Sequence, residues 1–168
     1  MSLYQLKYEQ VLETSLDEAW SFFCNPYNLA RITPEWLSFE VLDTPTEKVH
    51  PGLILRYRIR PLGGIPVTWV TEITHVREST LFVDEQRFGP YRFWHHLHYF
   101  EQTEEGIRML DLVHYRLYGG RLTTPLHRFL VRPRLEGIFE YRRQVLAEQF
   151  RKNPKLHKSH QDRKTDEP

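Results

Sequence analysis

The chain has 168 residues, 40% of them hydrophobic, and its 23 basic residues nearly balance 22 acidic ones. This length predicts a single domain with a substantial core, and the composition excludes disordered and membrane-spanning classes. The nearly neutral charge argues against a nucleic-acid partner, which requires clustered cations. We therefore expect one domain over residues 1–151 and a polar tail without fixed structure over 152–168.

The N-terminal segment does not resemble a secretion signal, and no apolar run is long enough to span a bilayer. These features predict a cytoplasmic protein without a transmembrane segment. Cys24 is the only cysteine, which excludes an internal disulfide and a cysteine-based zinc site.

The first third of the chain predicts a strand followed by two short helices. Apolar and polar residues alternate over 3–12, which indicates a strand. Ser15 and Glu18 form a capping box that opens a helix ending before Pro26. A second short helix is expected over 27–32.

Strand-like segments and one long helix make up the rest. Alternation and short turns predict antiparallel strands over 38–43, 53–60, 67–76, 80–87, 92–102 and 106–117. From the Thr124 N-cap to Arg151 the apolar residues have helical spacing, and Pro133 should kink or split this helix. The fold class is therefore α+β, with a curved antiparallel sheet wrapped around a long C-terminal helix.

Several stretches resemble one superfamily over about residues 3–150. They are Ala19–Phe23, Asn25–Pro34, Gly64–Pro66, Trp69–Thr71, Gly89–Tyr91 and Trp94–Phe100. This pattern is similar to the START-like, or SRPBCC, superfamily, and to its bacterial ligand-binding domains in particular. The resemblance implies a helix-grip fold with an apolar cavity between the sheet and the long helix. Many such domains bind small hydrophobic molecules, some are polyketide-cyclase-like enzymes, and no cofactor is implied.

The hairpin over 92–117 carries the most specific arrangement. A turn centred near 104–105 places opposing residues at positions that sum to about 209, so His98 faces Asp111. Side chains on alternate positions share a face. The following residues are therefore expected together, on the face that we expect to be concave: Trp94, His96, His98, Phe100, Met109, Asp111, Val113 and Tyr115.

The pairing of His98 with Asp111 has three interpretations. It is a general base with its orienting carboxylate, a polar anchor for a ligand, or a structural pair across two strands. His96 and His98 also have the spacing of two metal ligands on one strand, with Asp84 or Asp111 as further ligands. Because the resemblance includes no metal, we expect none.

We predict a module that binds a small, mostly hydrophobic molecule, such as an aromatic compound or a lipid. Its wall would comprise Trp69, Trp94, Phe100, Val113 and Tyr115, and its polar contacts Arg58, Asp84, His96, His98 and Asp111. The helix over 27–32 and the loop over 61–66 would form the entrance.

Two alternatives stay open. A cyclase or dehydratase would use His98 to move a proton and Asp111 to hold the imidazole. A regulatory domain would bind another protein, and the resemblance implies a partner with a nucleotide-sugar epimerase-like domain. The sequence leaves the oligomeric state undetermined.

Overall fold

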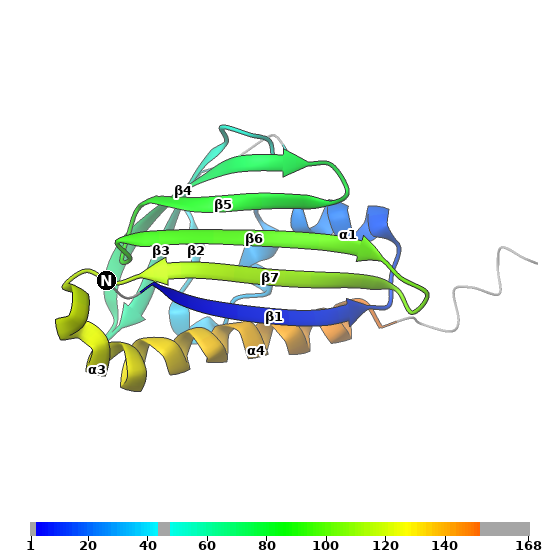
Figure 1. Ribbon diagram of the computed structural model, residues 1–168. Coiled ribbons are helices and arrows are strands. Elements are labelled where there is room, and N and C mark those ends of the chain that lie inside the picture. Colours follow the sequence, from blue (N-terminus) through cyan, green and yellow to red (C-terminus); the bar gives the residue numbers. More distant parts are fainter. Residues whose placement is uncertain (1–2, 44–47, 152–168) are drawn as a thin grey trace, which may run out of the picture.

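Figure 1 shows the computed structural model, which describes residues 3–43 and 48–151. The tail predicted over 152–168 lies outside the described residues. Within the described part, no helix combines the length and the apolar character needed to cross a membrane.

Seven antiparallel strands form one sheet in the order β1-β7-β6-β5-β4-β3-β2. Each strand from β2 to β6 pairs with the next along the chain, and β1 pairs with β7 at the other edge. The strands are β1 Tyr4–Leu12, β2 Glu40–Val41, β3 Ile54–Leu62, β4 Ile65–Arg77, β5 Leu81–Phe88, β6 Phe93–Gln102 and β7 Ile107–Arg116. The predicted strand over 38–43 is thus only two residues long.

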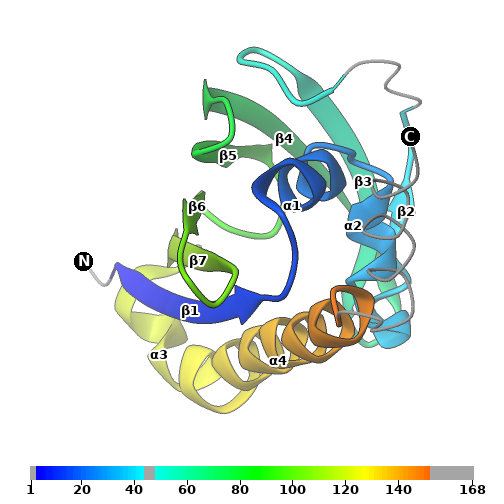
Figure 2. The same cartoon turned by 90° about the vertical axis from the view of Figure 1, so that its right-hand side faces the viewer.

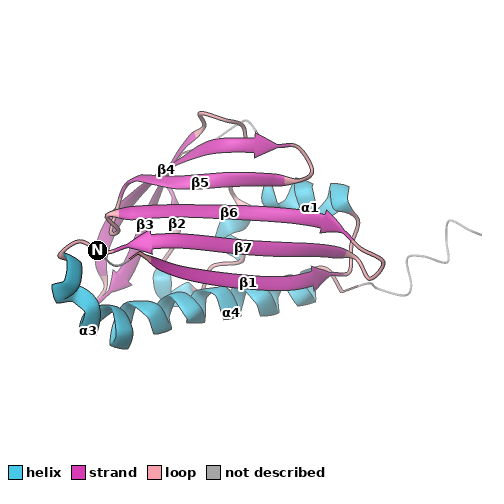
Figure 3. Cartoon of the chain, viewed as in Figure 1, coloured by secondary structure: helices cyan, strands magenta, loops and turns pink. Residues whose placement is uncertain are grey.

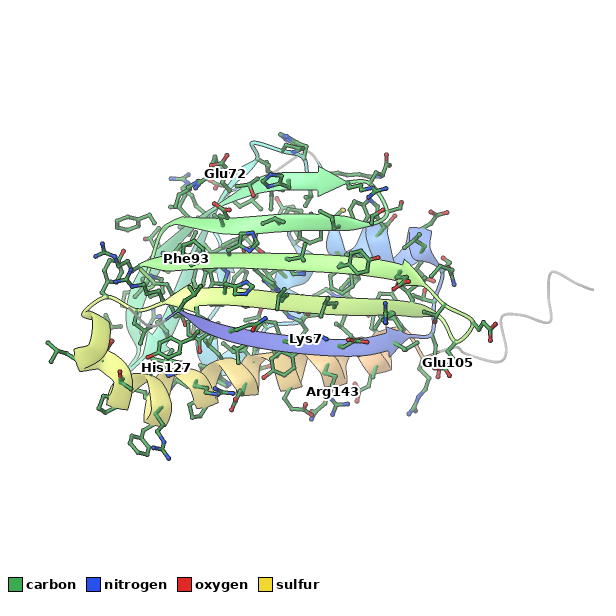
Figure 4. The ribbon with its side chains drawn as sticks, viewed as in Figure 1. Lys7, Glu72, Phe93, Glu105, His127 and Arg143 are labelled. Carbon is green, nitrogen blue, oxygen red and sulfur yellow. The ribbon has the colours of Figure 1, made fainter. Side chains whose placement is uncertain are left out.

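Alternation of side chains determines which face of the sheet is buried. On β6, Trp94, His96, His98 and Phe100 are buried, whereas the residues between them are half-buried. Phe93, at one end of the same strand, is exposed, and Glu105 lies in the turn at the other end of the sheet (Figure 4). The prediction that the Trp94 face is the inner one is confirmed.

Two short helices follow β1, α1 (Leu16–Phe23) and α2 (Asn28–Arg31). The Ser15 hydroxyl oxygen accepts a hydrogen bond from the Glu18 amide at 3.3 Å, as the capping box predicts. Glu18 does not complete the box through its carboxylate, which instead accepts from the Thr14 hydroxyl. A 3-10 turn, Glu35–Leu37, then leads into β2.

The C-terminal helical segment is interrupted before Pro133. It comprises α3 (Thr124–Leu126), a π-helical turn (His127–Val131) and α4 (Arg132–Gln149). Proline has no N–H, and its ring clashes with the carbonyl four residues earlier, so the regular bonding pattern cannot continue through it. The predicted split is confirmed. The predicted cap is one residue off, because Thr124 is the first helical residue and Thr123 precedes it.

The elements form two layers. Figure 2 shows the curved sheet with α4 across its open side and α1 inside the curve, toward the viewer. Figure 3 shows the helices gathered on one side of the strands. One group of buried side chains joins the helices to the sheet and includes Phe23 of α1, Phe100 of β6 and Leu146 of α4. The α+β layout predicted from the sequence is confirmed.

Cys24 ends α1 and is buried in this arrangement. Burial raises the pKa of its thiol to about 12. The thiol is therefore protonated at neutral pH, which matches a structural role rather than a nucleophilic one.

Gly106 is required by the turn between β6 and β7. Its φ is 142°, and a Cβ at this position would collide with the carbonyl oxygen of Leu12 on β1. We expect Gly106→Ala to lower the free energy of unfolding by roughly 1–3 kcal/mol, measured by urea denaturation. Gly137→Ala is the control, because nothing lies within 4 Å of its Cβ. Within α4 it should raise stability by about 0.5–1 kcal/mol. Equal effects of the two substitutions would contradict this account.

Candidate functional site

A cavity of about 370 Å³ lies between the inner face of β3–β6 and the helices α1, α2 and α4. Its wall is mostly apolar, with aromatic rings from the four strands β3 to β6. Trp69 and Trp94 meet edge to face with ring centroids 5.1 Å apart, and Tyr91 lies 5.6 Å from Trp69. The volume is within the range of sites for small organic molecules, roughly 300–1,000 Å³.

The cavity opens to solvent near α3. Trp36, Tyr118 and Leu126 line it and are 48%, 54% and 45% exposed, respectively. Arg134 bridges two sides of this opening, because its guanidinium donates to the Pro61 carbonyl and lies 5.4 Å over the Trp36 ring.

Both segments predicted to form the entrance contribute residues to the cavity lining. Asn28 and Leu29 from the segment 27–32 line the cavity, as does Pro61 from the segment 61–66. Ile65, at the tip of the turn between β3 and β4, is 67% exposed and does not line it.

The structure divides the predicted ligand-binding residues into two equal groups. Five of them line the cavity: Trp69, Asp84, Trp94, His96 and His98. The other five do not: Arg58, Phe100, Asp111, Val113 and Tyr115.

Those of the second group that are buried are covered by other side chains. Phe100 packs against Trp20 and Phe23 of α1, with centroid distances of 5.7 and 5.1 Å. The Tyr115 hydroxyl lies 2.8 Å from His127 Nε2, and Val113 is completely buried. Figure 4 marks His127 at the start of the helical segment below the sheet. These side chains pack behind the residues that line the cavity and do not face the cavity themselves.

We predicted that Arg58 contacts a ligand in the cavity, but Arg58 does not line the cavity. Its neighbours Tyr57 and Ile59 are buried, so the alternation of β3 turns Arg58 to the outer face. There its Nη1 lies 3.0 Å from Glu40 Oε2 of β2, with both side chains about half exposed. Such a surface pair contributes little to stability.

Two histidines and two aspartates form a compact buried cluster on the inner face. The observed register pairs His98 with Asp111, as predicted. The side chains also reach across the diagonals of the sheet. Asp84 Oδ2 lies 3.2 Å from His96 Nδ1 and 3.1 Å from His98 Nε2. Asp111 Oδ1 lies 2.9 Å from His96 Nε2 and 2.8 Å from His98 Nδ1. We call Asp84, His96, His98 and Asp111 the His/Asp cluster.

The cluster determines the charge of its own members. Burial alone would raise the pKa of Asp84, but His96 and His98 outweigh it and hold that pKa below its usual range. The same balance holds the pKa of Asp111 low. Burial alone would lower the pKa of His96, but Asp84 and Asp111 shift it upward. Asp84 and Asp111 are therefore ionised at neutral pH, and the imidazole of His96 between them is more basic than usual.

Arg142 of α4 is a functional candidate that the sequence analysis missed. Only 7% of its surface is exposed, and it lines the cavity. Its guanidinium lies 5.0 Å from the Phe139 ring, and Nε and Nη1 have no hydrogen-bond partner among the described residues. Buried cationic donors are normally paired, so this side chain is suited to a ligand oxygen.

A signal for Arg142 was present in the sequence. Leu135, Phe139, Arg142 and Leu146 follow one another at helical spacing, and all four are buried. An arginine within an otherwise apolar helix face indicates a buried charge that needs a partner.

Comparison with solved structures establishes the fold. TTHA0849 from Thermus thermophilus matches with a TM-score of 0.66 at 18% identity, covering 88% of this chain and 97% of that protein. The ginseng major latex-like protein 151 from Panax ginseng matches with a TM-score of 0.65 at 11% identity, covering 89% and 99%. The chain has the helix-grip fold. CV1439 from Chromobacterium violaceum shares the helix-grip fold at 12% identity, with a TM-score of 0.65 and coverage of 89% and 98%.

The predicted resemblance is thus confirmed at the level of the helix-grip fold. No family model matches the sequence, and a search of curated proteins finds no relative. At identities of 11–18% the structural matches show the fold alone.

Proposed function

We propose that this protein binds a small, mostly hydrophobic ligand in the cavity between its sheet and α4. The observation that carries the proposal is the apolar, aromatic-rich wall of a 370 Å³ cavity that opens to solvent beside Trp36 and Leu126. An apolar wall with few polar groups is typical of sites for small organic ligands, because burial supplies affinity and the polar groups fix orientation.

The polar groups of the wall indicate an acidic function on this ligand. Arg142 offers two unpaired N–H groups from α4, and a carboxylate or sulfonate accepts such a pair of bonds. The His/Asp cluster approaches the same region, since the His96 and Phe139 rings are 5.7 Å apart and Arg142 lies over Phe139. A ligand with an apolar body and one acidic end would satisfy both kinds of wall.

The first experiment is native mass spectrometry of the purified chain, followed by denaturing extraction of any bound compound. A retained amphipathic acid would support the proposal and identify the ligand class. A retained compound without apolar surface would contradict it. A protein that carries nothing is titrated with an apolar fluorescent probe.

Binding of N-phenyl-1-naphthylamine, a neutral apolar fluorophore, is expected at about one molecule per chain. Ile138→Glu places a carboxylate on the cavity-facing side of α4, where Ile138 is half-buried. We expect this variant to weaken the probe's affinity by about tenfold or more, equivalent to about 1.4 kcal/mol.

Leu112→Glu is the matched control. Leu112 is half-buried on the outer face of β7 and does not line the cavity. Its affinity for the probe should stay within about twofold of the unaltered protein, while near-UV circular dichroism confirms that both variants are folded. Equal loss in both variants, or no saturable binding in the unaltered protein, would overturn the proposal.

An enzyme of the cyclase or dehydratase type is the second candidate, and the His/Asp cluster favours it. His98 Nε2 lies 3.1 Å from Asp84 Oδ2 on the cavity wall, a geometry that suits proton transfer. If the cavity is catalytic, His98→Gln abolishes turnover and leaves probe binding intact.

The protein-interaction alternative instead predicts capture of an epimerase-like partner in the absence of any small ligand.

A further inference from the structure

Three donor atoms of the His/Asp cluster converge on one point at the cavity wall. They are Asp84 Oδ2, His96 Nδ1 and His98 Nε2, with separations of 3.2 and 3.1 Å between the carboxylate oxygen and the two nitrogens. Ligand atoms of these three residues all lie within 4.8 Å of one another. Bonds of about 2.0–2.1 Å in a tetrahedral metal site separate neighbouring ligand atoms by roughly 3.3 Å, which is close to the observed spacing.

Asp111 lies behind both imidazoles, on the side away from the cavity. Its Oδ1 is 2.9 Å from His96 Nε2 and 2.8 Å from His98 Nδ1, the nitrogens that do not face Asp84. A carboxylate that contacts the distal nitrogen of a histidine fixes the tautomer in which the other nitrogen carries a free lone pair. Asp111 makes this hydrogen bond with His96, and its Oδ1 also lies 2.8 Å from His98 Nδ1, so one carboxylate is placed to orient both imidazoles toward the same point.

Hydrogen bonds within the cluster do not satisfy all of its polar atoms. His98 Nδ1 is buried and, although close to Asp111, lacks the alignment of a hydrogen bond with any described residue. If every contact were a hydrogen bond, both imidazoles would have to be doubly protonated. A cation held by Asp84, His96 and His98 removes this requirement, because each histidine then needs only one N–H.

We propose that Asp84, His96 and His98 bind a divalent first-row transition-metal ion, with Asp111 as the residue that positions both histidines. Two imidazoles and one carboxylate form the mixed nitrogen and oxygen set that suits Zn²⁺ and Fe²⁺. This inference goes beyond the ligand-binding function proposed above and departs from the expectation that the protein holds no metal.

The site lies where a bound ion could contact a ligand in the cavity. Asp84, His96 and His98 all line the cavity, and Asp84 retains 18% of its side-chain surface. Three protein ligands leave further coordination positions, and these face the cavity rather than the core. Such an open site differs from a structural metal site, whose positions are all filled by protein. A polar group of the cavity ligand can therefore bind the ion directly.

The test uses the full chain, stripped with a chelator and then titrated with Zn²⁺ or Co²⁺. We expect close to one ion per chain by elemental analysis, and visible Co²⁺ absorption that Zn²⁺ abolishes. Asp84→Asn and His98→Gln should each weaken the affinity at least tenfold. Asp111→Asn should weaken it by about 10–100-fold and shift the Co²⁺ spectrum, because it perturbs both imidazoles without removing a ligand.

His95 provides the matched control. It precedes His96 on β6 and points to the outer face, where its ring lies 6.2 Å from that of His114. His95→Gln should leave stoichiometry, affinity and the Co²⁺ spectrum unchanged. Binding that is lost in His95→Gln but retained in Asp84→Asn would assign the ion to surface histidines and overturn the proposal. Substoichiometric binding by the unaltered chain would overturn it as well.

The two proposals fail separately. N-phenyl-1-naphthylamine has no metal-binding group, so its titration of the chelator-stripped protein reports on the cavity alone. Metal binding without probe binding would remove the proposed ligand function and leave the metal site. Probe binding without metal would do the reverse.

Discussion

Asp111→Ala is expected to lower the free energy of unfolding of the metal-free protein by about 3–5 kcal/mol, the loss typical of removing one partner from a buried ion pair. Asp111 is 5% exposed and contacts both His96 and His98 within 3 Å. Without it, two buried imidazoles keep only Asp84 as an anionic partner. Urea denaturation in the presence of a chelator measures this loss without any contribution from bound metal.

Glu101→Ala is the control for this measurement. Glu101 lies on the neighbouring strand β6 and pairs with Arg108 of β7, with side chains that are 42% and 45% exposed. A solvent-exposed pair contributes about 0–1 kcal/mol, so this substitution should have little effect. A loss below about 1 kcal/mol for Asp111→Ala, similar to that of Glu101→Ala, would show that the His/Asp cluster does not depend on its buried carboxylate.

The sequence was sufficient to predict the strand pairing that builds the cluster. A short turn after β6 leaves little freedom in register, and the predicted pairs Trp94–Tyr115 and His98–Asp111 are the observed ones. The strict alternation of side chains in a strand then determines which residues share a face. The same rule, applied to β3, would have excluded Arg58, because Tyr57 and Ile59 on either side of it point inward.

The diagonal contacts within the cluster could not be predicted in this way. Register gives the residue directly opposite, which is Asp84 for His96 and Asp111 for His98, whereas the contacts of Asp84 with His98 and of Asp111 with His96 are diagonal. These diagonals depend on side-chain rotamers and on sheet curvature. The curvature in turn depends on irregular pairing, such as the register shift of β4 against β5 between Ile73 and His75.

The cavity itself depends on how α4 lies across the sheet, which a pattern along the chain does not specify. Helical spacing predicts that Phe139 and Leu146 face the core, and both do. It does not distinguish side chains that pack against the sheet from those that line a space above it. Arg142 lies on the same helix face, and only the packed structure shows that two of its nitrogens have no partner among the described residues.

Arg142→Met is expected to weaken binding of an apolar anion by at least about 30-fold, which corresponds to 2 kcal/mol or more for the loss of a buried charge partner. The probe is 1-anilinonaphthalene-8-sulfonate, which has the ring system of N-phenyl-1-naphthylamine with an added sulfonate. Methionine keeps much of the length of arginine and removes its charge. Affinity for the neutral probe should therefore stay within about twofold of the unaltered protein.

The stability of the same variant separates a binding role from a structural one. Arg142 is buried with unpaired nitrogens, so an apolar residue of similar length should leave the free energy of unfolding unchanged or raise it. Arg143→Met is the control, because Arg143 is 52% exposed and paired with Glu140 on the outer side of α4. It should change the affinity for neither probe. Equal weakening of both probes by Arg142→Met, together with lower stability, would mean that Arg142 supports the wall through packing on Phe139. Selective loss of the anionic probe at unchanged stability would instead assign Arg142 to the acidic end of the ligand.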